Sequence, residues 1–401
     1  MILEKALKIL EQPMCDQCLG RQFGQLLHGY TNEQRGHLIR TIAAMAIDQE
    51  KANPTVDYAN FTEFTFHNRD EKKAQKKPCS ACNGLFEKLE TWIAKAYKKA
   101  GKLEFKTFLI GTKPPFALVA TEEQLWERVG IDYCEPLNAQ INREVGKQLE
   151  KQFHAKFDPK RPDVAFLLNM DSNTVDIHVN PLFIAGEYQK LKRGIPQTRW
   201  PSGKYRTSVE QIIAKPYMKT TKGTGHKLHA MGREDIDARC LGWRPFILEI
   251  LEPVTRTIDL KKLAKKIGKE VRVQHLRYAT INDVRTLKEA HPDKTYRIFV
   301  MTKESFDKKD IKKLATLKEI RQQTPTRVQH RRADKRRIRH VRQIKARVVN
   351  KKTLELIVRA EAGLYIKELI TGDNGRTVPC VSDILGKSCT FRDLDVLAIH
   401  F

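Results

Sequence analysis

The sequence predicts an α+β fold in two parts, and three observations support this prediction. Some segments repeat apolar residues at helical spacing, whereas others form short β-branched and aromatic runs typical of strands. The chain has 401 residues, 40% of them hydrophobic and 30% charged, which suits two or three globular domains. Residues 1–200 contain 29 Lys+Arg and 25 Asp+Glu, and residues 201–401 contain 45 and 23, so the halves carry +4 and +22 of the total +26. We expect parts 1–190 and 191–401, divided beside the Pro-containing segment 192–206.

Two cysteine pairs mark the N-terminal part. Cys15 and Cys18 form one C-x-x-C turn, and Cys79 and Cys82 form another. Four thiolates from two such turns are the tetrahedral donor set that zinc prefers, with no open position for catalysis. The pattern predicts a structural zinc ion, and the alternatives are a redox dithiol or two unrelated turns. The other cysteines are expected to be small packed side chains: Cys134, Cys240, Cys380 and Cys389.

The remaining N-terminal segments mix expected strands and helices. Residues 108–110 and 116–120 are predicted strands around a Lys-Pro-Pro turn. Apolar residues at every fourth position predict a helix, namely Ile141, Val145, Leu149 and Phe153. Residues 164–170 and 175–179 are predicted to form a hairpin. This part offers no catalytic constellation, so we expect it to hold or position a ligand.

The C-terminal part alternates strands with helices. Asp259 is placed to cap a helix over 260–267, and Val284 and Leu287 lie on a further helix. Strands are predicted over residues 244–251, 271–278, 294–301 and 354–360. Lys294 and Tyr296 are two positions apart on a strand, which places them on one face. Tyr296 is either a packing residue or, beside a nucleotide site, a ring on which an unstacked base can stack.

A dense charge cluster lies in the segment 229–250. Its members fall within seven residues, immediately before an apolar strand: Arg233, Glu234, Asp235, Asp237 and Arg239. Carboxylates held beside guanidinium groups can keep one of them ionised and oriented, as a nucleophile or general base requires. The alternative is a solvated, salt-bridged turn, because surface ion pairs are common.

A basic run occupies residues 327–347, with ten Lys or Arg and one acidic residue. Such a run repels itself unless phosphates neutralise it, so it predicts sequence-independent contact with a polyanion. Its candidate phosphate-binding residues are Arg331, Arg332, Arg336 and Arg337. A solvated loop or a localisation signal is the alternative, but the run leads into the strand at 354–360, which favours a place in the fold.

Several segments resemble known families. RPDVAFLL and DIHVNPLFIAGEY, between residues 161 and 188, resemble the end of a THUMP domain, an RNA-binding module of tRNA-modifying enzymes. GREDIDARCLG with RPF, KTY at 294–296, TPTRVQHRRAD, and AGLYIKEL followed by GDNGRTVP resemble the tRNA pseudouridine synthases of archaea and eukaryotes that act on the TΨC arm. Between LG and RPF the family usually has an extra residue and a glycine, where this chain has only Trp243.

The resemblance covers nearly the whole chain and implies its fold and activity. It implies a zinc-binding, THUMP-like α/β part for RNA binding, followed by a catalytic domain with a mixed, mainly antiparallel sheet. It also implies that uridine in tRNA is isomerised to pseudouridine at position 55, with position 54 as a second candidate. No organic cofactor is then needed.

The resemblance also implies roles for individual residues. Asp235 matches the nucleophile of the family, and Arg233 matches the residue that helps to displace the target base. Tyr296 matches the aromatic residue that stacks on the flipped uracil and moves its C5 proton. Lys367 matches the basic partner of the carboxylate, and Tyr365 matches a wall of the uridine pocket. Asp237 then becomes a secondary, structural residue.

Two other functions use the same features. A THUMP-containing tRNA methyltransferase or thiolation enzyme is disfavoured, because the sequence has neither a strand with a Gly-rich methyl-donor turn nor a P-loop. A non-catalytic, zinc-containing tRNA-binding protein or RNA chaperone would use the same side chains only to bind. We expect tRNA as the partner, no nucleotide cofactor, and a cytoplasmic location without membrane contact, because no apolar run approaches the ~20 residues that cross a bilayer. The sequence leaves the oligomeric state open.

Overall fold

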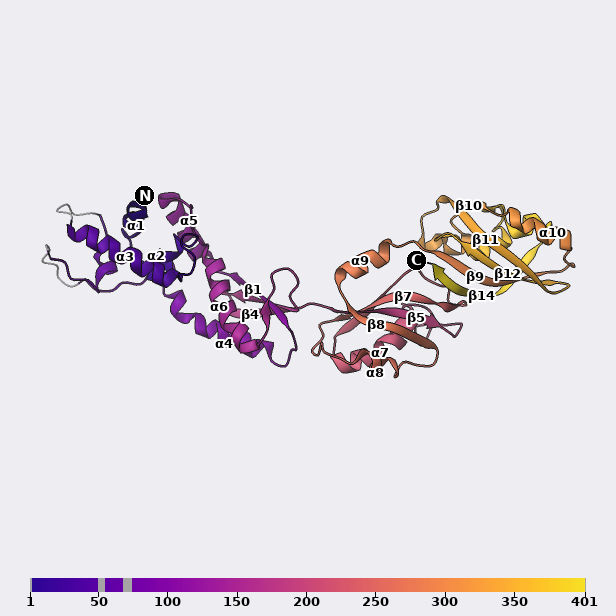
Figure 1. Ribbon diagram of the computed structural model, residues 1–401, viewed down its shortest axis with the longest axis horizontal. Helices are drawn as coiled ribbons and strands as arrows, with labels where there is room; N and C mark the ends of the chain where they lie inside the picture. Colours follow the sequence, from indigo (N-terminus) through magenta and orange to yellow (C-terminus); the bar gives the residue numbers. More distant parts are fainter. Residues whose placement is uncertain (1, 50–54, 68–73, 401) are drawn as a thin grey trace. The chain divides into compact units, whose positions relative to one another are not determined.

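The computed structural model describes residues 2–49, 55–67 and 74–400. It divides into two compact units, Met1–Asn180 and Pro181–Phe401, which are coloured along the chain in Figure 1. The division falls ten residues before the expected one, because strand β5 (Leu182–Lys190) pairs with β7 (Arg239–Leu251) and β8 (Val271–Ala279) of the second unit. The segment 192–206 therefore lies within the second unit and does not connect the two.

Unit 1 combines a helical segment with a small α/β segment. Its first elements are α1 (Ile2–Ile9), α2 (Asp16–Arg21), α3 (Asn32–Gln49), η1 (Tyr58–Phe61) and η2 (Leu85–Lys88). They are followed by α4 (Leu89–Ala100), β1 (Thr107–Lys113), α5 (Phe116–Val129), α6 (Leu137–Phe153), β2 (Lys156–Phe157), β3 (Val164–Asn169) and β4 (Thr174–Val179). The four strands form one sheet in the order β2-β1-β3-β4, and β3 and β4 form the predicted antiparallel hairpin.

Helices α4 and α6 supply the apolar layer that packs on this sheet. Ile141, Val145 and Leu149 of α6 are buried against Phe108 and Phe166 of the strands, as the four-residue spacing predicts. The predicted strand over 116–120 is wrong, because these residues form the first turns of α5. Pro115 precedes that helix with an extended backbone, and the apolar run is the start of a longer helical pattern.

The helical segment owes its close packing to two glycines. A Cβ on Gly20 of α2 would lie 1.8 Å from the carbonyl oxygen of Asn32, and one on Gly36 of α3 would lie 2.0 Å from that of Asp16. Only glycine permits these helices to approach so closely. Cys15 precedes α2 directly, and Cys18 lies on it, so the first cysteine pair is fixed by this contact.

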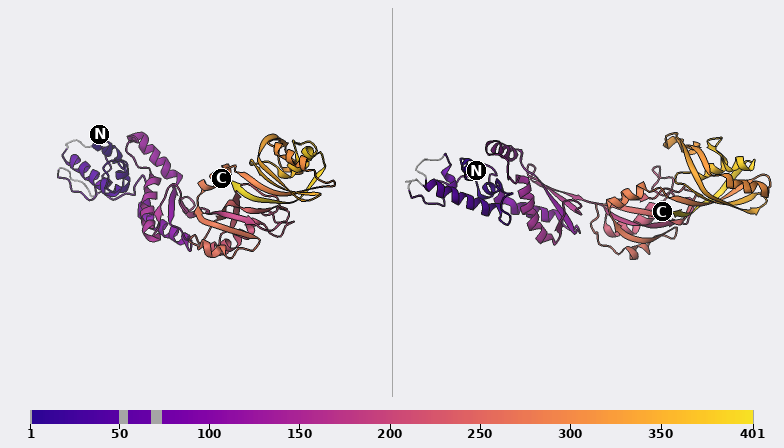
Figure 2. Two further views of the ribbon diagram at one scale, coloured as in Figure 1. Left: turned by 45° about the vertical axis from the view of Figure 1, so that its right-hand side comes forward. Right: turned by 45° about the horizontal axis from the view of Figure 1, so that its top comes forward.

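Unit 2 is built on a ten-stranded mixed sheet. Its order is β13-β10-β11-β12-β9-β14-β7-β5-β8, with β6 also paired to β7. Besides β5, β7 and β8 it contains α7 (Val209–Thr221), β6 (Gly225–Ala230), α8 (Leu260–Ala264), α9 (Ile281–Glu289), β9 (Asp293–Thr302), α10 (Lys308–Lys313), η3 (Leu314–Thr316) and β10 (Glu319–Gln323). The chain continues through η4 (Thr326–Arg331), β11 (Arg336–Asn350), β12 (Thr353–Ala360), α11 (Ile366–Thr371), β13 (Thr377–Val378), α12 (Val381–Leu385) and β14 (Cys389–His400). Figure 2 shows these strands from two further directions.

The strand pairing confirms the expected α+β class. Among the described strand pairs of the large sheet, only β7 and β14 are parallel, and the others are antiparallel. In the small sheet of unit 1, β1 is parallel to β2 and β3. Asp259 caps α8 by accepting a hydrogen bond from the Lys262 amide, as predicted, although the helix ends before Ile267.

One apolar core gathers beneath α11 and α12, and a second beneath α7 and α8. The described helices include none that is both long and apolar enough to span a membrane.

Candidate active site

The charge cluster forms a turn that joins β6 to β7. Gly232 adopts φ +79° at the start of this turn, a conformation that side chains rarely tolerate. Asp235 and Asp237 lie farther along the turn, and Trp243, at which the sequence departs from the resembled family, lies inside strand β7. The turn ends where β7 pairs with β14, at Arg239 opposite Asp395. This pairing joins β5, β6, β7 and β8 to the strands from β9 to β13, so the turn lies beside elements of both groups.

A buried lysine fixes the backbone of this turn. Lys190 is fully buried at the end of β5, and its ammonium donates hydrogen bonds to the carbonyl oxygens of Ile195, Asp235 and Ile236 at 2.8, 3.0 and 3.2 Å. Three donors thus meet three acceptors, which offsets the cost of burying the charge. Lys190 therefore ties the segment after β5 to the backbone of Asp235.

A polar network lies beneath the same turn. The Glu234 carboxylate accepts hydrogen bonds from the Tyr188 hydroxyl at 3.0 and 3.1 Å and lies 3.0 Å from Nε of the buried Arg244. Gln197 donates to the Tyr188 hydroxyl at 2.8 Å and to the Gly232 carbonyl at 3.0 Å. Glu234 therefore points into the protein, which leaves Asp235 and the more exposed Asp237 as the carboxylates of the cluster that face the site.

Two cations from distant segments hold the Asp235 carboxylate. Lys367 Nζ lies 3.2 Å from it, and the Arg327 guanidinium lies 3.3 Å from it. Burial alone would raise the pKa of Asp235, but the charges of Arg327 and Lys367 more than offset burial and lower it below its usual value. Lys367 also donates to both oxygens of the more exposed Asp237 at 2.8 Å. The arrangement keeps an ionised carboxylate in a partly buried site.

Arg327 and Glu368 are site residues that the sequence analysis missed. Arg327 Nε donates to Glu368 Oε1 at 2.6 Å, and its guanidinium lies 5.9 Å from the centre of the Tyr365 ring. Arg327 belongs to the basic run that was assigned to phosphate contact, yet its charge is committed to two carboxylates. Two features of the sequence could have indicated these residues. Arg327 lies in the motif TPTRVQHRRAD, and Glu368 directly follows the predicted site residue Lys367. Lys190 gave no sequence signal.

The other predicted site residues differ in exposure. Tyr296 is partly buried on β9, and burial, together with the charge of Asp235, raises its pKa to about 12, so the phenol is protonated at neutral pH. Arg233 is exposed beside Asp235. Arg332 and Arg336 are also exposed, and neither has a carboxylate within 4 Å in the described part of the chain. Arg337 donates to the Thr324 hydroxyl. The Arg331 side chain lies outside the described residues, although its backbone ends η4.

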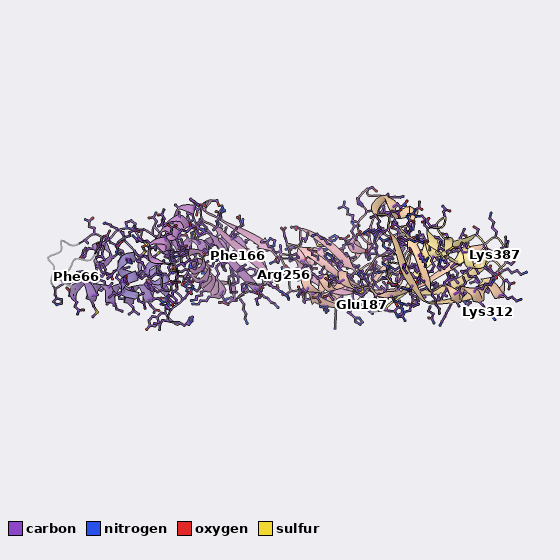
Figure 3. All side chains as sticks on the ribbon, turned by 90° about the horizontal axis from the view of Figure 1, so that it is seen from above. Phe66, Phe166, Glu187, Arg256, Lys312 and Lys387 are labelled. Atoms are coloured by element: carbon purple, nitrogen blue, oxygen red, sulfur yellow. The ribbon has the colours of Figure 1, made fainter. Side chains whose placement is uncertain are left out.

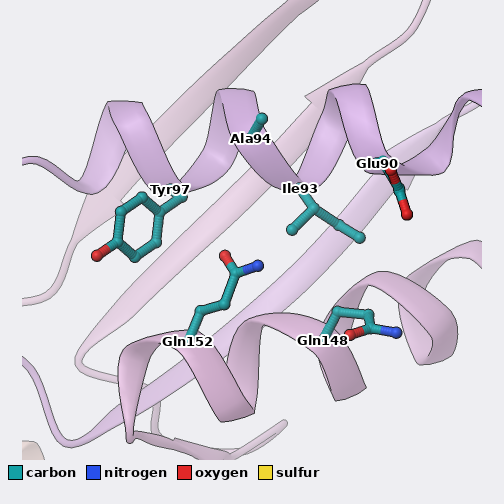
Figure 4. Close-up of a pocket in the computed structure, with 6 residues that line it drawn as sticks. All are labelled: Glu90, Ile93, Ala94, Tyr97, Gln148 and Gln152. Carbon is teal, nitrogen blue, oxygen red and sulfur yellow. The ribbon is translucent and has the colours of Figure 1, made fainter.

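Two hollows lie away from this site. One, of about 680 Å³, lies between α4 and α6 of unit 1, where Tyr97 faces Gln152 (Figure 4). Another, of about 460 Å³, lies beside α9 in unit 2 and includes Glu187, which is labelled in Figure 3. Asp235 lines neither of them.

The four predicted metal ligands meet in unit 1. The Sγ atoms of Cys15, Cys18, Cys79 and Cys82 all lie within 4.8 Å of one another, and those of Cys15 and Cys82 are 3.7 Å apart. A tetrahedral site with Zn–S bonds of about 2.3 Å places sulfur atoms about 3.8 Å apart. The donor set and its spacing therefore fit one zinc ion. The other four cysteines are buried outside the cluster, as predicted.

Comparisons with known proteins identify the family of both units. Residues 183–400 match the family described as "Pus10, C-terminal", and residues 92–169 match "Pus10 THUMP domain, archaeal". A protein of Methanocaldococcus jannaschii named tRNA pseudouridine synthase Pus10 is 38% identical, over 97% of this chain and 92% of its own. Its namesake in Pyrococcus furiosus is 36% identical, over 100% and 98%. Among solved structures, a Cbf5-Nop10-Gar1 complex aligns over 52% of this chain and 47% of that chain, with 16% identity and a TM-score of 0.32.

The sequence relatives decide the class of the protein. An α+β chain with an N-terminal THUMP segment and a matched C-terminal domain of this kind is a pseudouridine synthase, and hence an isomerase. The resemblance found from the motifs is confirmed. The chain belongs to the Pus10 family.

Proposed function

We propose that this chain isomerises uridine to pseudouridine in the TΨC arm of tRNA, with Asp235 as the nucleophile. Position 55 is the expected target, and position 54 is a second candidate. The observation that carries the proposal is the Asp235 carboxylate, held ionised between Lys367 and Arg327 at the surface of unit 2. The names of the relatives, tRNA pseudouridine synthase, support tRNA as the substrate.

The reaction needs few groups. The bond between ribose C1′ and uracil N1 breaks, the base turns, and C1′ bonds to C5, while C5 loses a proton and N1 gains one. Reactant and product are isomers, so no oxidant or organic cofactor takes part. A carboxylate that attacks the ribose or the ring forms a transient covalent bond and divides one difficult step into two.

The remaining groups are assigned around this nucleophile. We assign the Tyr296 ring as the surface on which the flipped uracil stacks, and its hydroxyl to the transfer of the C5 proton. Tyr365 forms a second wall, and Arg233 helps to displace the base from its stack, which costs a few kcal/mol. Arg331, Arg332, Arg336 and Arg337 contact the RNA backbone, and the THUMP segment of unit 1 supplies a further RNA-binding surface.

We also propose that the cysteine cluster binds a structural zinc ion. The four thiolates occupy every position of a tetrahedral ion, so the ion would hold the first cysteine turn to the second and supply no chemistry to the reaction. We also propose a cytoplasmic location, where disulfides are disfavoured, and this location supports metal binding over oxidation.

The first prediction tests the nucleophile. Asp235→Asn is nearly isosteric and should abolish pseudouridine formation while tRNA affinity stays unchanged or improves slightly, because the amide is a far poorer nucleophile and one charge facing phosphate is lost. Single-turnover product formation on a tRNA transcript, detected by uridine-specific derivatisation and mass, measures the effect. Filter binding on the same transcript measures affinity.

Asp237→Asn is the matched control. It removes the same formal charge two residues away, and it also removes a partner of Lys367, yet it should retain substantial activity. Full turnover by the Asp235→Asn protein, or a loss confined to Asp237→Asn, contradicts the assignment.

A further inference from the structure

A buried lysine beside the active-site turn has no counterion among the described residues. Lys294 is 8% exposed on β9, two positions from Tyr296. Its ammonium makes one long contact, 3.4 Å to the Pro292 carbonyl, and has no carboxylate within 4 Å in the described part of the chain. A buried, unpaired ammonium is costly, so such a group is expected to meet an anion in the working protein.

The neighbouring guanidinium also has unused capacity. Arg244 is fully buried, and its Nη2 has no hydrogen-bond partner among the described residues, although Nη1 donates to the Met231 carbonyl at 2.7 Å and Nε lies near Glu234. Arg244 thus has Glu234 as its carboxylate partner, whereas Lys294 has none within 4 Å among the described residues. Burial and the charge of Arg244 lower the pKa of Lys294 to about 8, which reflects this imbalance.

Both cations lie against Gly232, the exposed residue that opens the turn. A Cβ on Gly232 would lie 3.2 Å from Arg244 Nη1 and 3.4 Å from Lys294 Nζ. Any other residue would crowd the two nitrogens, and the exposed Gly232 has no side chain to cover them. Gly232 is three residues from Asp235, and the exposed Arg233 lies between them.

We propose that Lys294, with Arg244 behind it, forms a phosphate-binding subsite on the open side of Gly232 that holds the phosphodiester adjacent to the isomerised uridine. The subsite rests on the proposed function, since a flipped nucleotide keeps a phosphate on each side of its ribose. Charge-assisted hydrogen bonds to one of these phosphates fix the ribose relative to Asp235. Lys294 is therefore a substrate-binding residue.

The protein side of the test uses Lys294→Met, with Lys294→Arg to restore the charge and Lys312→Met as an exposed control on α10. Lys294→Met should bind tRNA roughly tenfold or more weakly, because a hydrogen bond to a charged group is lost, and should lower the slope of log affinity against log salt by about one. Lys294→Arg should recover most of the affinity, and Lys312→Met should match the unchanged protein. Circular dichroism and thermal melting check that each variant folds.

The RNA side of the test needs no variant. Transcripts that carry one neutral methylphosphonate, placed on either side of the target uridine, should bind the unchanged protein more weakly at one of the two linkages. At that linkage, Lys294→Met should cause no further loss, so the two changes are not additive. Additive losses at both linkages, or normal binding of both transcripts by the unchanged protein, overturn the subsite.

The outcomes separate this inference from the proposed function. Absence of pseudouridine formation by the unchanged protein would sink the proposed function itself. Normal activity of the unchanged protein, with Lys294→Met binding normally and losing only its rate above about pH 7, would instead make Lys294 a proton acceptor and would overturn the phosphate subsite alone.

Discussion

The charge state of Asp235 is set by residues that are far from it in the sequence. Arg327 and Lys367 lower its pKa against the effect of burial. Because the pKa is lower in the folded than in the unfolded chain, ionised Asp235 stabilises unit 2 above its unfolded pKa, and this stabilisation is lost as the pH falls through the folded pKa. Activity that needs the carboxylate should follow the same titration.

The prediction at this scale concerns the acid limb of the activity. Lys367→Met removes one of the two cations, so the pKa of Asp235 should rise and the loss of activity in acid should begin at a higher pH. Single-turnover rates measured from about pH 4 to pH 8 give the pH at which activity is half lost on the acid side. This pH can be compared between proteins even if the overall rate of the variant is lower. Lys367→Arg, which keeps the charge, should leave the limb in place. An acid limb at the same pH in Lys367→Met would show that this charge does not control Asp235.

Several of these residue contacts could not be read from the sequence. The motifs placed Asp235 and Lys367 together through the family resemblance, and the structure brings them within 3.2 Å. Arg327 lies 92 positions from Asp235, and its contact with Glu368 is a partly buried pair whose members come from η4 and α11. A charged residue in a basic run shows no local sign that its partner is a distant carboxylate.

At the scale of elements, the basic run is largely a strand. Residues 336–350 form β11, which pairs with β10 at one end and with β12 at the other. Hydrogen bonds of the sheet hold the backbone, so the exposed arginines are presented on a fixed element. This arrangement confirms the expectation that the run belongs to the fold.

The salt dependence of RNA binding tests this surface. Arg332→Gln with Arg336→Gln removes two exposed charges and should weaken binding to all RNAs alike, lowering the slope of log affinity against log salt by about two, since each phosphate contact releases counterions. Binding measured from roughly 50 to 200 mM salt gives the slope. Lys303→Gln with Lys312→Gln, a pair of exposed lysines of the same unit, is the control of equal charge. If both pairs change the slope equally, net charge and not this strand governs binding.

The sequence predicted most helices and strands, but it did not predict which sheet each strand joins. The hairpin of β3 and β4, the apolar face of α6 and the cap of α8 follow from local patterns, and all are present. The run at 116–120 has strand composition yet begins α5, because residues after it extend a helical pattern. The segment DIHVNPLFIAGEY was likened to the end of a THUMP domain, but its last residues belong to β5, which pairs with β7 and β8 within unit 2.

At the scale of the whole molecule, each unit has its own cores and its own sheet. The apolar clusters of unit 1 contain no residue of unit 2, and the reverse also holds among the described residues. Units with separate cores can lose structure separately. The cysteine cluster belongs to unit 1, whereas Asp235 and its partners belong to unit 2.

Removal of zinc should therefore affect one unit only. Binding of a structural zinc ion contributes roughly 10 kcal/mol or more to the folding of small zinc domains, so Cys15, Cys18, Cys79 and Cys82 changed together to Ser should unfold the helical segment of unit 1. Hydrogen exchange followed by mass spectrometry should show lost protection in α1, α2 and α3 and unchanged protection in β7, β9 and β14. Metal analysis should find about one zinc in the unchanged chain and none in the variant. Cys134→Ser, a buried cysteine of the same unit outside the cluster, should keep the metal. Stoichiometric zinc in the quadruple variant, with normal protection of α2, would rule out the cluster as the metal site.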